Sequence, residues 1–297
     1  MGDRVETLEM TAQDGIVLRG RRFDGGPDAH QQRPVVCLAG LTRNGRDFNH
    51  LAETLSSGAR SRTVYTFDMR GRGVSDFPSD WKSYTILREL NDVIDLMTAF
   101  GLFDVALVGT SRGGLLGLGL LAMQPTRIGA LVLNDIGPVL DMDGIMRIAG
   151  YVGTTVTPAS WDEAAQIVKR AGERHFAKTT DAEWEVIARQ WFNEGANGEP
   201  TAGYDTNLSK TFEVPAEGLP ELWPQFEAAT RVPCLTIRGE NSDILSTPTL
   251  ERMAERHPKF RSFIVPDQGH APFLRDEATL TAIRDFLDAA DAERKTH

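Results

Sequence analysis

Residues 109–113 read Gly-Thr-Ser-Arg-Gly and place Ser111 between two glycines in the pattern Gly-x-Ser-x-Gly. An apolar run over residues 105–108 comes directly before this pattern, and an apolar stretch beginning near Leu115 follows it. This order predicts a buried strand, a tight turn and a helix, with the serine in the turn. A hydroxyl there projects above the sheet, and the amides at the helix start favour negative charge at the same place. The segment therefore predicts a nucleophilic serine.

A serine nucleophile needs a base to take its proton and a carboxylate to orient that base. Two later loops supply candidates. Residues 232–239 read as a buried strand whose following loop contains Asp243, and a strand over 261–265 is followed by a loop containing His270. Both side chains lie past the carboxyl ends of strands, where ligands bind in parallel α/β sheets. We therefore predict a catalytic triad of Ser111, Asp243 and His270.

A second carboxylate competes for the acid position. Asp135 also follows a predicted strand, over residues 128–133, although it could simply cap the entry into the next segment. Asp267 precedes His270 too closely to orient it easily and is expected to be a turn residue. We favour Asp243 and keep Asp135 as the alternative.

The composition bounds the class of protein. Hydrophobic residues make up 41% of the 297-residue chain and charged residues 25%, values typical of a soluble globular protein. The net charge of −10 argues against a nucleic-acid or anionic-membrane partner. The first residues lack an apolar signal region, and no apolar run approaches transmembrane length. Cys37 and Cys234 lie in predicted core strands, which favours buried thiols over a disulfide or metal site. We expect a cytoplasmic protein.

Strand and helix patterns alternate through the first part of the chain. Residues 5–10 and 16–23 alternate apolar and polar side chains around Gln-Asp-Gly, which predicts a hairpin. Short apolar runs suit strands buried on both faces; they cover residues 34–39, 63–67, 105–108 and 128–133. Apolar residues spaced three and four apart over 86–100 predict an amphipathic helix. Such alternation implies a mostly parallel sheet with helical crossovers.

The alternation stops from about residue 137 to residue 228. Helical patterns remain over 161–171 and 181–192, and strand periodicity resumes at Val232. We interpret this stretch as a mostly helical insertion between two core strands, lying over the active-site end of the sheet.

With strand order, serine turn and triad order in place, the chain resembles the α/β-hydrolase fold superfamily, in particular its capped serine hydrolases. Residues 38–41, Leu-Ala-Gly-Leu, lie where relatives carry a His-Gly pair after the third strand, and residues 67–76 resemble the loop after the fourth. The resemblance implies an α/β fold with a mostly parallel eight-stranded sheet flanked by helices. It also implies the domain division, with residues 1–137 and 228–297 as the core and residues 138–227 as a helical cap.

The resemblance further implies that the backbone N–H groups of Leu41 and Arg112 form an oxyanion hole. Ala39 replaces the usual histidine of the family, but this departure should matter little because backbone amides form the hole. Dehalogenase and epoxide-hydrolase relatives use an aspartate as nucleophile, so the serine at position 111 disfavours those branches.

Two arginines adjoin the predicted oxyanion residues. The guanidinium groups of Arg43 and Arg112 could hold a substrate carboxylate, or turn outward and pair with Asp68 or Asp76 as a structural brace. Among the aromatic residues of the predicted cap, Trp191 is a candidate substrate contact.

We therefore predict a serine hydrolase that acts on carboxylic esters of small to medium molecules through an acyl-enzyme. It would need no cofactor and no metal, and its partner would be a small-molecule ester substrate. An enol-lactonase or a C–C bond hydrolase could use the same triad. A ligand-binding protein of the same fold, with an idle triad, is the alternative outside enzymes.

Overall fold

The chain forms one eight-stranded sheet with strand order β1-β2-β4-β3-β5-β6-β9-β10. The structure, a computed structural model, describes residues 4–154, 157–211 and 219–294. The strands are β1 (Val5–Thr11), β2 (Val17–Phe23), β3 (Val35–Leu38), β4 (Val64–Asp68), β5 (Val105–Thr110), β6 (Ile128–Asn134), β9 (Cys234–Gly239) and β10 (Phe260–Val265). The β1–β2 hairpin and its pairing with β4 are antiparallel, and the other pairs are parallel. The predicted mostly parallel, eight-stranded α/β sheet is confirmed.

Helices cover both faces of this sheet because its central strands are apolar on both sides. Every residue of β3 and β9 is buried. On β5, Leu107 packs into one core cluster and Val108 into the other, as alternation along a strand requires. The first cluster includes side chains of α2 (Ile86–Ala99), α3 (Arg112–Met123) and α8 (Thr247–Arg256). The second includes α1 (Asn49–Leu55) and α9 (Glu277–Arg294).

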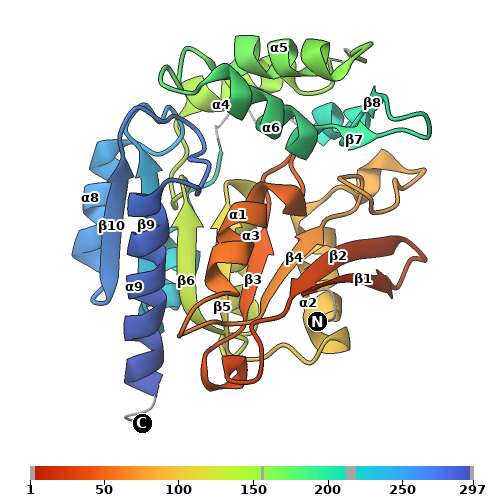
Figure 1. The fold of residues 1–297 in the computed structure, drawn as a ribbon. Helices are drawn as coiled ribbons and strands as arrows, with labels where there is room; N and C mark the ends of the chain where they lie inside the picture. The colour runs from red at the N-terminus through yellow and green to blue at the C-terminus, as the bar shows by residue number, and fades with distance from the viewer. Residues whose placement is uncertain (1–3, 155–156, 212–218, 295–297) are drawn as a thin grey trace.

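The segment between β6 and β9 is mainly helical. It contains α4 (Met142–Tyr151), α5 (Trp161–Gly172), α6 (Asp181–Trp191), and the short strands β7 (Asn193–Glu194) and β8 (Pro200–Thr201). In Figure 1 these elements lie above the end of the sheet toward which the central strands point. Helices α5 and α6 share a small core of their own, which includes Trp184 and Ile187 and also touches Phe273 of the main domain.

The last part of this segment belongs with the core. Helix α7 (Trp223–Ala228) packs against α3, and its Trp223 and Phe226 side chains join the main apolar cluster. Residues 155–156 and 212–218 of the predicted cap lie outside the described residues. The division into a core and a cap over residues 138–227 therefore stays a prediction.

Short 3₁₀ helices complete the described elements. They are η1 (Ala29–Gln31), η2 (Gly45–Phe48), η3 (Trp81–Ser83), η4 (Thr206–Thr211) and η5 (Ala229–Arg231). Cys37 and Cys234 are buried free thiols, as predicted. Within the part of the chain that the structure describes, no helix has the length and apolarity needed to cross a bilayer.

Candidate active site

Ser111 lies in the turn between β5 and α3 with φ 50° and ψ −116°. This combination is sparsely populated for a residue with a side chain, so its surroundings must hold it. The amide of Ser111 donates to the carbonyl of Asn134 at 3.1 Å, while its own carbonyl accepts from the amides of Gly114 and Leu115. The neighbouring strand and the first helical turn thereby fix the serine in place.

The two glycines of the motif let three elements approach closely. A Cβ atom on Gly113 would lie 2.0 Å from the carbonyl oxygen of Leu38, at the end of β3. A Cβ atom on Gly109 would lie 2.5 Å from the amide nitrogen of Gly114. Both positions therefore need glycine for the close approach of backbone to backbone.

The imidazole of His270 connects Ser111 to a carboxylate. Its Nε2 lies 3.0 Å from Ser111 Oγ, and its Nδ1 lies 2.8 Å from Oδ2 of Asp135. The side chain of His270 is 7% exposed and that of Asp135 is fully buried. A carboxylate facing Nδ1 selects the tautomer in which Nδ1–H donates to it, which leaves Nε2 free to accept the serine proton.

The prediction that Asp243 contacts the histidine is wrong, because Asp135 occupies that position. Strand β6, which Asp135 follows directly, lies beside β5, so its end reaches the serine turn. The carboxylate is fixed there by two further donors: the amide of Gly239 to Oδ1 at 2.9 Å and the hydroxyl of Ser242 to Oδ2 at 2.6 Å. Asp243 instead binds Arg147 of α4 in a bidentate ion pair, with one contact at 2.8 Å.

The predicted oxyanion amides adjoin the serine. A Cβ atom on Gly40 would lie 3.7 Å from Ser111 Cβ, so the segment that leads into Leu41 packs against the serine. Arg112 is the first residue of α3, where backbone N–H groups have no partner within the helix. Neither amide donates to another residue of the described chain. The oxyanion hole that these two amides would form stays a prediction.

The Arg112 side chain pairs with a buried carboxylate and is not among the residues that line the cavities near Ser111. Its Nε donates to Oε2 of Glu89 at 2.6 Å, whereas Asp68 and Asp76 were the partners weighed from the sequence. Oε1 of Glu89 accepts from Arg72 at 2.6 Å, and Arg72 in turn donates to the Leu41 carbonyl at 2.7 Å. One buried carboxylate thus supports the residues on both sides of the predicted oxyanion hole.

The charge of Glu89 is stabilised in this position. Burial alone would raise the pKa of its carboxyl, but the guanidinium groups of Arg72 and Arg112 outweigh burial and hold the pKa below its usual range. An ionised carboxylate between two guanidinium groups forms charge-assisted hydrogen bonds, which are the strong ones.

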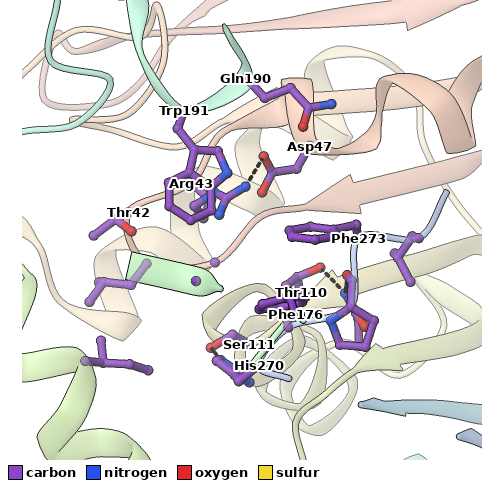
Figure 2. A pocket seen from close by; sticks show the side chains of 18 of the residues that line it. Thr42, Arg43, Asp47, Thr110, Ser111, Phe176, Gln190, Trp191, His270 and Phe273 are labelled. Carbon is purple, nitrogen blue, oxygen red and sulfur yellow. Dashed lines mark hydrogen bonds and ion pairs between the residues drawn. The ribbon is translucent and has the colours of Figure 1, made fainter. Parts of the chain in front are cut away.

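A cavity of about 110 Å³ opens at Ser111 and His270. Figure 2 shows Ser111 and His270 facing one another at its base, with Arg43 beside Trp191 at another wall. The Arg43 guanidinium lies 3.5 Å from the centre of the Trp191 ring and donates to Asp47 at 2.7 Å. Both predicted substrate contacts therefore line the cavity.

Aromatic side chains from the insertion form much of the remaining wall. Phe176 and Trp184 line the same cavity and pack against Phe273 from the loop after β10, with a ring separation of 4.4 Å for Phe176. Trp161, also in the insertion, does not line this cavity; its indole N–H donates to the Gly198 carbonyl. The described residues contain no group of three or more His, Cys, Asp or Glu side chains placed to hold a metal ion.

Residues 35–282 match the model of a family described as the alpha/beta hydrolase family. The chain belongs to this family. The α/β hydrolase is 32% identical over 271 residues to the 3-hydroxybutyrate-oligomer hydrolase of Cupriavidus necator, which covers 89% of this chain and 91% of that protein. It is 24% identical over 276 residues to the 2-(acetamidomethylene)succinate hydrolase of Mesorhizobium japonicum, covering 92% of each.

A crystal structure of an alpha/beta hydrolase from Novosphingobium aromaticivorans matches this α/β hydrolase with a TM-score of 0.88. The two chains are 36% identical, and the match covers 96% of this chain and 98% of that one. The family and the fold predicted from the serine turn are confirmed.

Proposed function

We propose that this α/β hydrolase is a serine hydrolase of carboxylic esters, with Ser111 as nucleophile, His270 as general base and Asp135 as the carboxylate that orients it. The observation that carries the proposal is the hydrogen-bonded line from Ser111 Oγ through the imidazole to Asp135, with separations of 3.0 and 2.8 Å. Nucleophile, base and orienting group within hydrogen-bond reach are what acyl transfer through serine requires.

In the first half of the reaction, Ser111 Oγ attacks the carbonyl carbon while Nε2 of His270 takes the hydroxyl proton. The negative charge that develops on the carbonyl oxygen accepts hydrogen bonds from the amides of Leu41 and Arg112, each worth about 3–4 kcal/mol in comparable sites. The tetrahedral intermediate collapses, its bond to the alcohol oxygen breaks, and the imidazolium returns the proton to the leaving alcohol. Asp135 stabilises the positive imidazolium throughout.

In the second half, water attacks the acyl-enzyme. His270 takes a proton from the water, the ester bond to Ser111 Oγ breaks, and the same proton restores the serine hydroxyl. The products are a carboxylic acid and an alcohol, and the enzyme returns to its starting state.

We also propose that the part of the insertion between β6 and α7 acts as a substrate-selecting cap. Phe176, Trp184 and Trp191 of the insertion line the cavity above Ser111, so they are placed to contact the acyl or alcohol part of an ester. Replacing Trp191 with Ala should change the preference among acyl chain lengths more than it changes the labelling of Ser111 by a small reactive probe. Equal changes in both would contradict selection by the cap.

The relative that hydrolyses 3-hydroxybutyrate oligomers supports an ester as the substrate, since such oligomers are joined by ester bonds. A small-molecule ester also suits the limited volume of the cavity. Lactones and C–C bonds next to a ketone can be cleaved by the same triad, so a substrate panel should include both.

The direct test is turnover of p-nitrophenyl esters of increasing acyl length by the wild-type protein and by Ser111→Ala. The alanine variant should lose nearly all turnover while keeping the melting temperature of the wild type. Ser57→Ala, which removes an exposed serine hydroxyl far from the motif in sequence, is the matched control and should retain full activity. Full activity in Ser111→Ala would overturn the proposal, as would turnover of the lactone or C–C substrates alone.

A further inference from the structure

A second cavity of about 220 Å³ adjoins the one at Ser111 and lies under the insertion. His270, Arg43 and Trp191 line both cavities, so a substrate held at Ser111 can extend from one into the other. The second cavity is also lined by Arg147 and His175, and no aspartate or glutamate of the described chain lines it. Both arginines pair with carboxylates that lie outside this lining, Arg43 with Asp47 and Arg147 with Asp243.

The Arg43 side chain lines both cavities and has one donor that no described residue satisfies. One terminal nitrogen donates to Asp47, which lines the first cavity but not the second. The buried Nε of Arg43 has no hydrogen-bond partner among the described residues. A buried, unsatisfied donor carries a desolvation cost that a ligand acceptor would remove. Burial also lowers the pKa of this guanidinium to about 10, which leaves it charged at neutral pH.

Arg147 enters the same cavity from α4. Asp243 binds the guanidinium edge formed by Nε and Nη2, so Nη1 lies outside that bidentate pair. The phenol of Tyr151 lines the cavity near both arginines: burial raises its pKa, and the guanidinium groups of Arg147 and Arg43 oppose that rise. The cavity wall therefore offers guanidinium and hydroxyl donors side by side.

We propose that Arg43 and Arg147, with the hydroxyl of Tyr151, form a subsite that binds a carboxylate group of the substrate at a distance from its scissile ester. This inference rests on the proposed ester hydrolysis at Ser111. Guanidinium groups bind carboxylates through charge-assisted hydrogen bonds, and a partly desolvated site strengthens them. Asp47 lines the first cavity only, so a carboxylate in the second cavity meets no acidic side chain among its described lining residues.

The test compares acid-bearing esters with neutral analogues of the same size. In the first pair, p-nitrophenyl hydrogen glutarate and its methyl ester, the free or blocked carboxylate is on the acyl side. In the second pair, p-carboxyphenyl and p-carbamoylphenyl butyrate, the carboxylate or its neutral amide is on the alcohol side. The measured quantity is the ratio of kcat/KM for the acid to that for the neutral ester. For the pair that matches the subsite, Arg147→Gln and Arg43→Gln should each lower this ratio at least about tenfold.

Arg170→Gln is the matched control, because it removes the same charge from an exposed position of the insertion that lines neither cavity. Its ratio should equal that of the wild type. Asp243→Asn separates recognition from bracing. If Arg147 binds the substrate, removing its partner carboxylate should leave the ratio unchanged or higher. If Arg147 only braces α4, Asp243→Asn and Arg147→Gln should each lower kcat/KM equally for the acid and for the neutral ester. Equal losses of kcat/KM for the acid and the neutral ester would overturn the subsite. Ratios that stay at the wild-type value for both substrate pairs in Arg43→Gln and in Arg147→Gln would overturn it as well.

A binding measurement on Ser111→Ala distinguishes failure of the subsite from failure of the reaction. Monomethyl glutarate should bind this variant in calorimetry, and adding Arg147→Gln should weaken its binding at least about tenfold. Binding with this response, in a protein that cleaves no ester, would support the subsite while refuting the proposed reaction. Ester cleavage at Ser111 without any effect of the arginines on binding would refute the subsite alone.

Discussion

Replacing Asp135 with asparagine should nearly abolish turnover while preserving the fold. Oδ2 of Asp135 faces Nδ1 of His270 and the hydroxyl of Ser242, and Oδ1 accepts from the Gly239 amide. In the variant, the asparagine carbonyl can keep the bond from Gly239, which turns its NH₂ group toward the imidazole. That group donates to Nδ1 and selects the tautomer with the proton on Nε2, which can no longer accept the proton of Ser111.

The loss expected from a wrong tautomer is ~10⁴ in kcat, or about 5 kcal/mol in the activation barrier. The hydroxyl of Ser242 can rotate to accept from the new NH₂ group, so little stability should be lost. Asp243→Asn is the matched control, because its carboxylate is 24% exposed and pairs with Arg147.

The assay is steady-state hydrolysis of p-nitrophenyl butyrate, with circular dichroism to verify the fold of each variant. Asp243→Asn should stay within a few-fold of the wild type on this neutral ester. If Asp135→Asn kept activity within tenfold of the wild type, or if Asp243→Asn were the crippled variant, the assignment of the orienting carboxylate would be refuted.

Three further predictions concern residues around the site and the core. Glu89→Gln should lower kcat by up to ~10² with little change in KM, because Arg112 loses the anion that holds it beside the serine; parallel kcat and KM measurements check this, and a change in KM alone would contradict it. Burial lowers the pKa of His257 below its usual 6.5, so the unfolded state binds the proton more readily and stability falls as the pH drops below 6.5. The melting temperature should therefore decrease from pH 7 to pH 5, and His257→Gln should flatten that decrease; an equal slope in the variant would refute the cause. Gly113→Ala should cost about 3 kcal/mol or more in the free energy of unfolding, because its Cβ would lie 2.0 Å from the carbonyl oxygen at the end of β3, whereas Gly150→Ala, with open space around it, should be tolerated in the same denaturation assay.

The serine turn and the sheet could be predicted because their signals are local. Two glycines around Ser111, an apolar run before it and an apolar helix after it are contiguous in the sequence, and each core strand appears as its own short apolar run. The position of His270 after the last strand is equally local. These features depend on neighbours in the chain, so periodicity and turn chemistry are enough to find them.

Which carboxylate contacts His270 depends on information that a single sequence does not carry. Asp135 and Asp243 both follow strands, and the choice between them depends on the order of the strands in the sheet. The choice depends also on Arg147, a residue of α4 in the insertion, because its guanidinium binds the Asp243 carboxylate. One local signal favoured Asp135: it follows its strand directly, whereas Asp243 comes several residues after the end of β9.

The partner of Arg112 was missed for a related reason. Glu89 lies on α2, and only the packing of that helix against α3 brings its carboxylate between Arg112 and Arg72. Asp68 and Asp76, which the sequence suggested as partners of Arg112, bind elsewhere. Asp68 accepts from backbone amides, and Asp76 pairs with Arg19.

Labelling with a fluorophosphonate, followed by peptide mass spectrometry, tests the central claim most directly. The reagent forms a stable bond with a serine only when a base activates the hydroxyl, so it reports the nucleophile without requiring knowledge of the substrate. We expect a single adduct on the peptide that contains Ser111, absent in Ser111→Ala and formed far more slowly in Asp135→Asn. An adduct on a different serine, or none on the folded wild-type protein, would contradict the account.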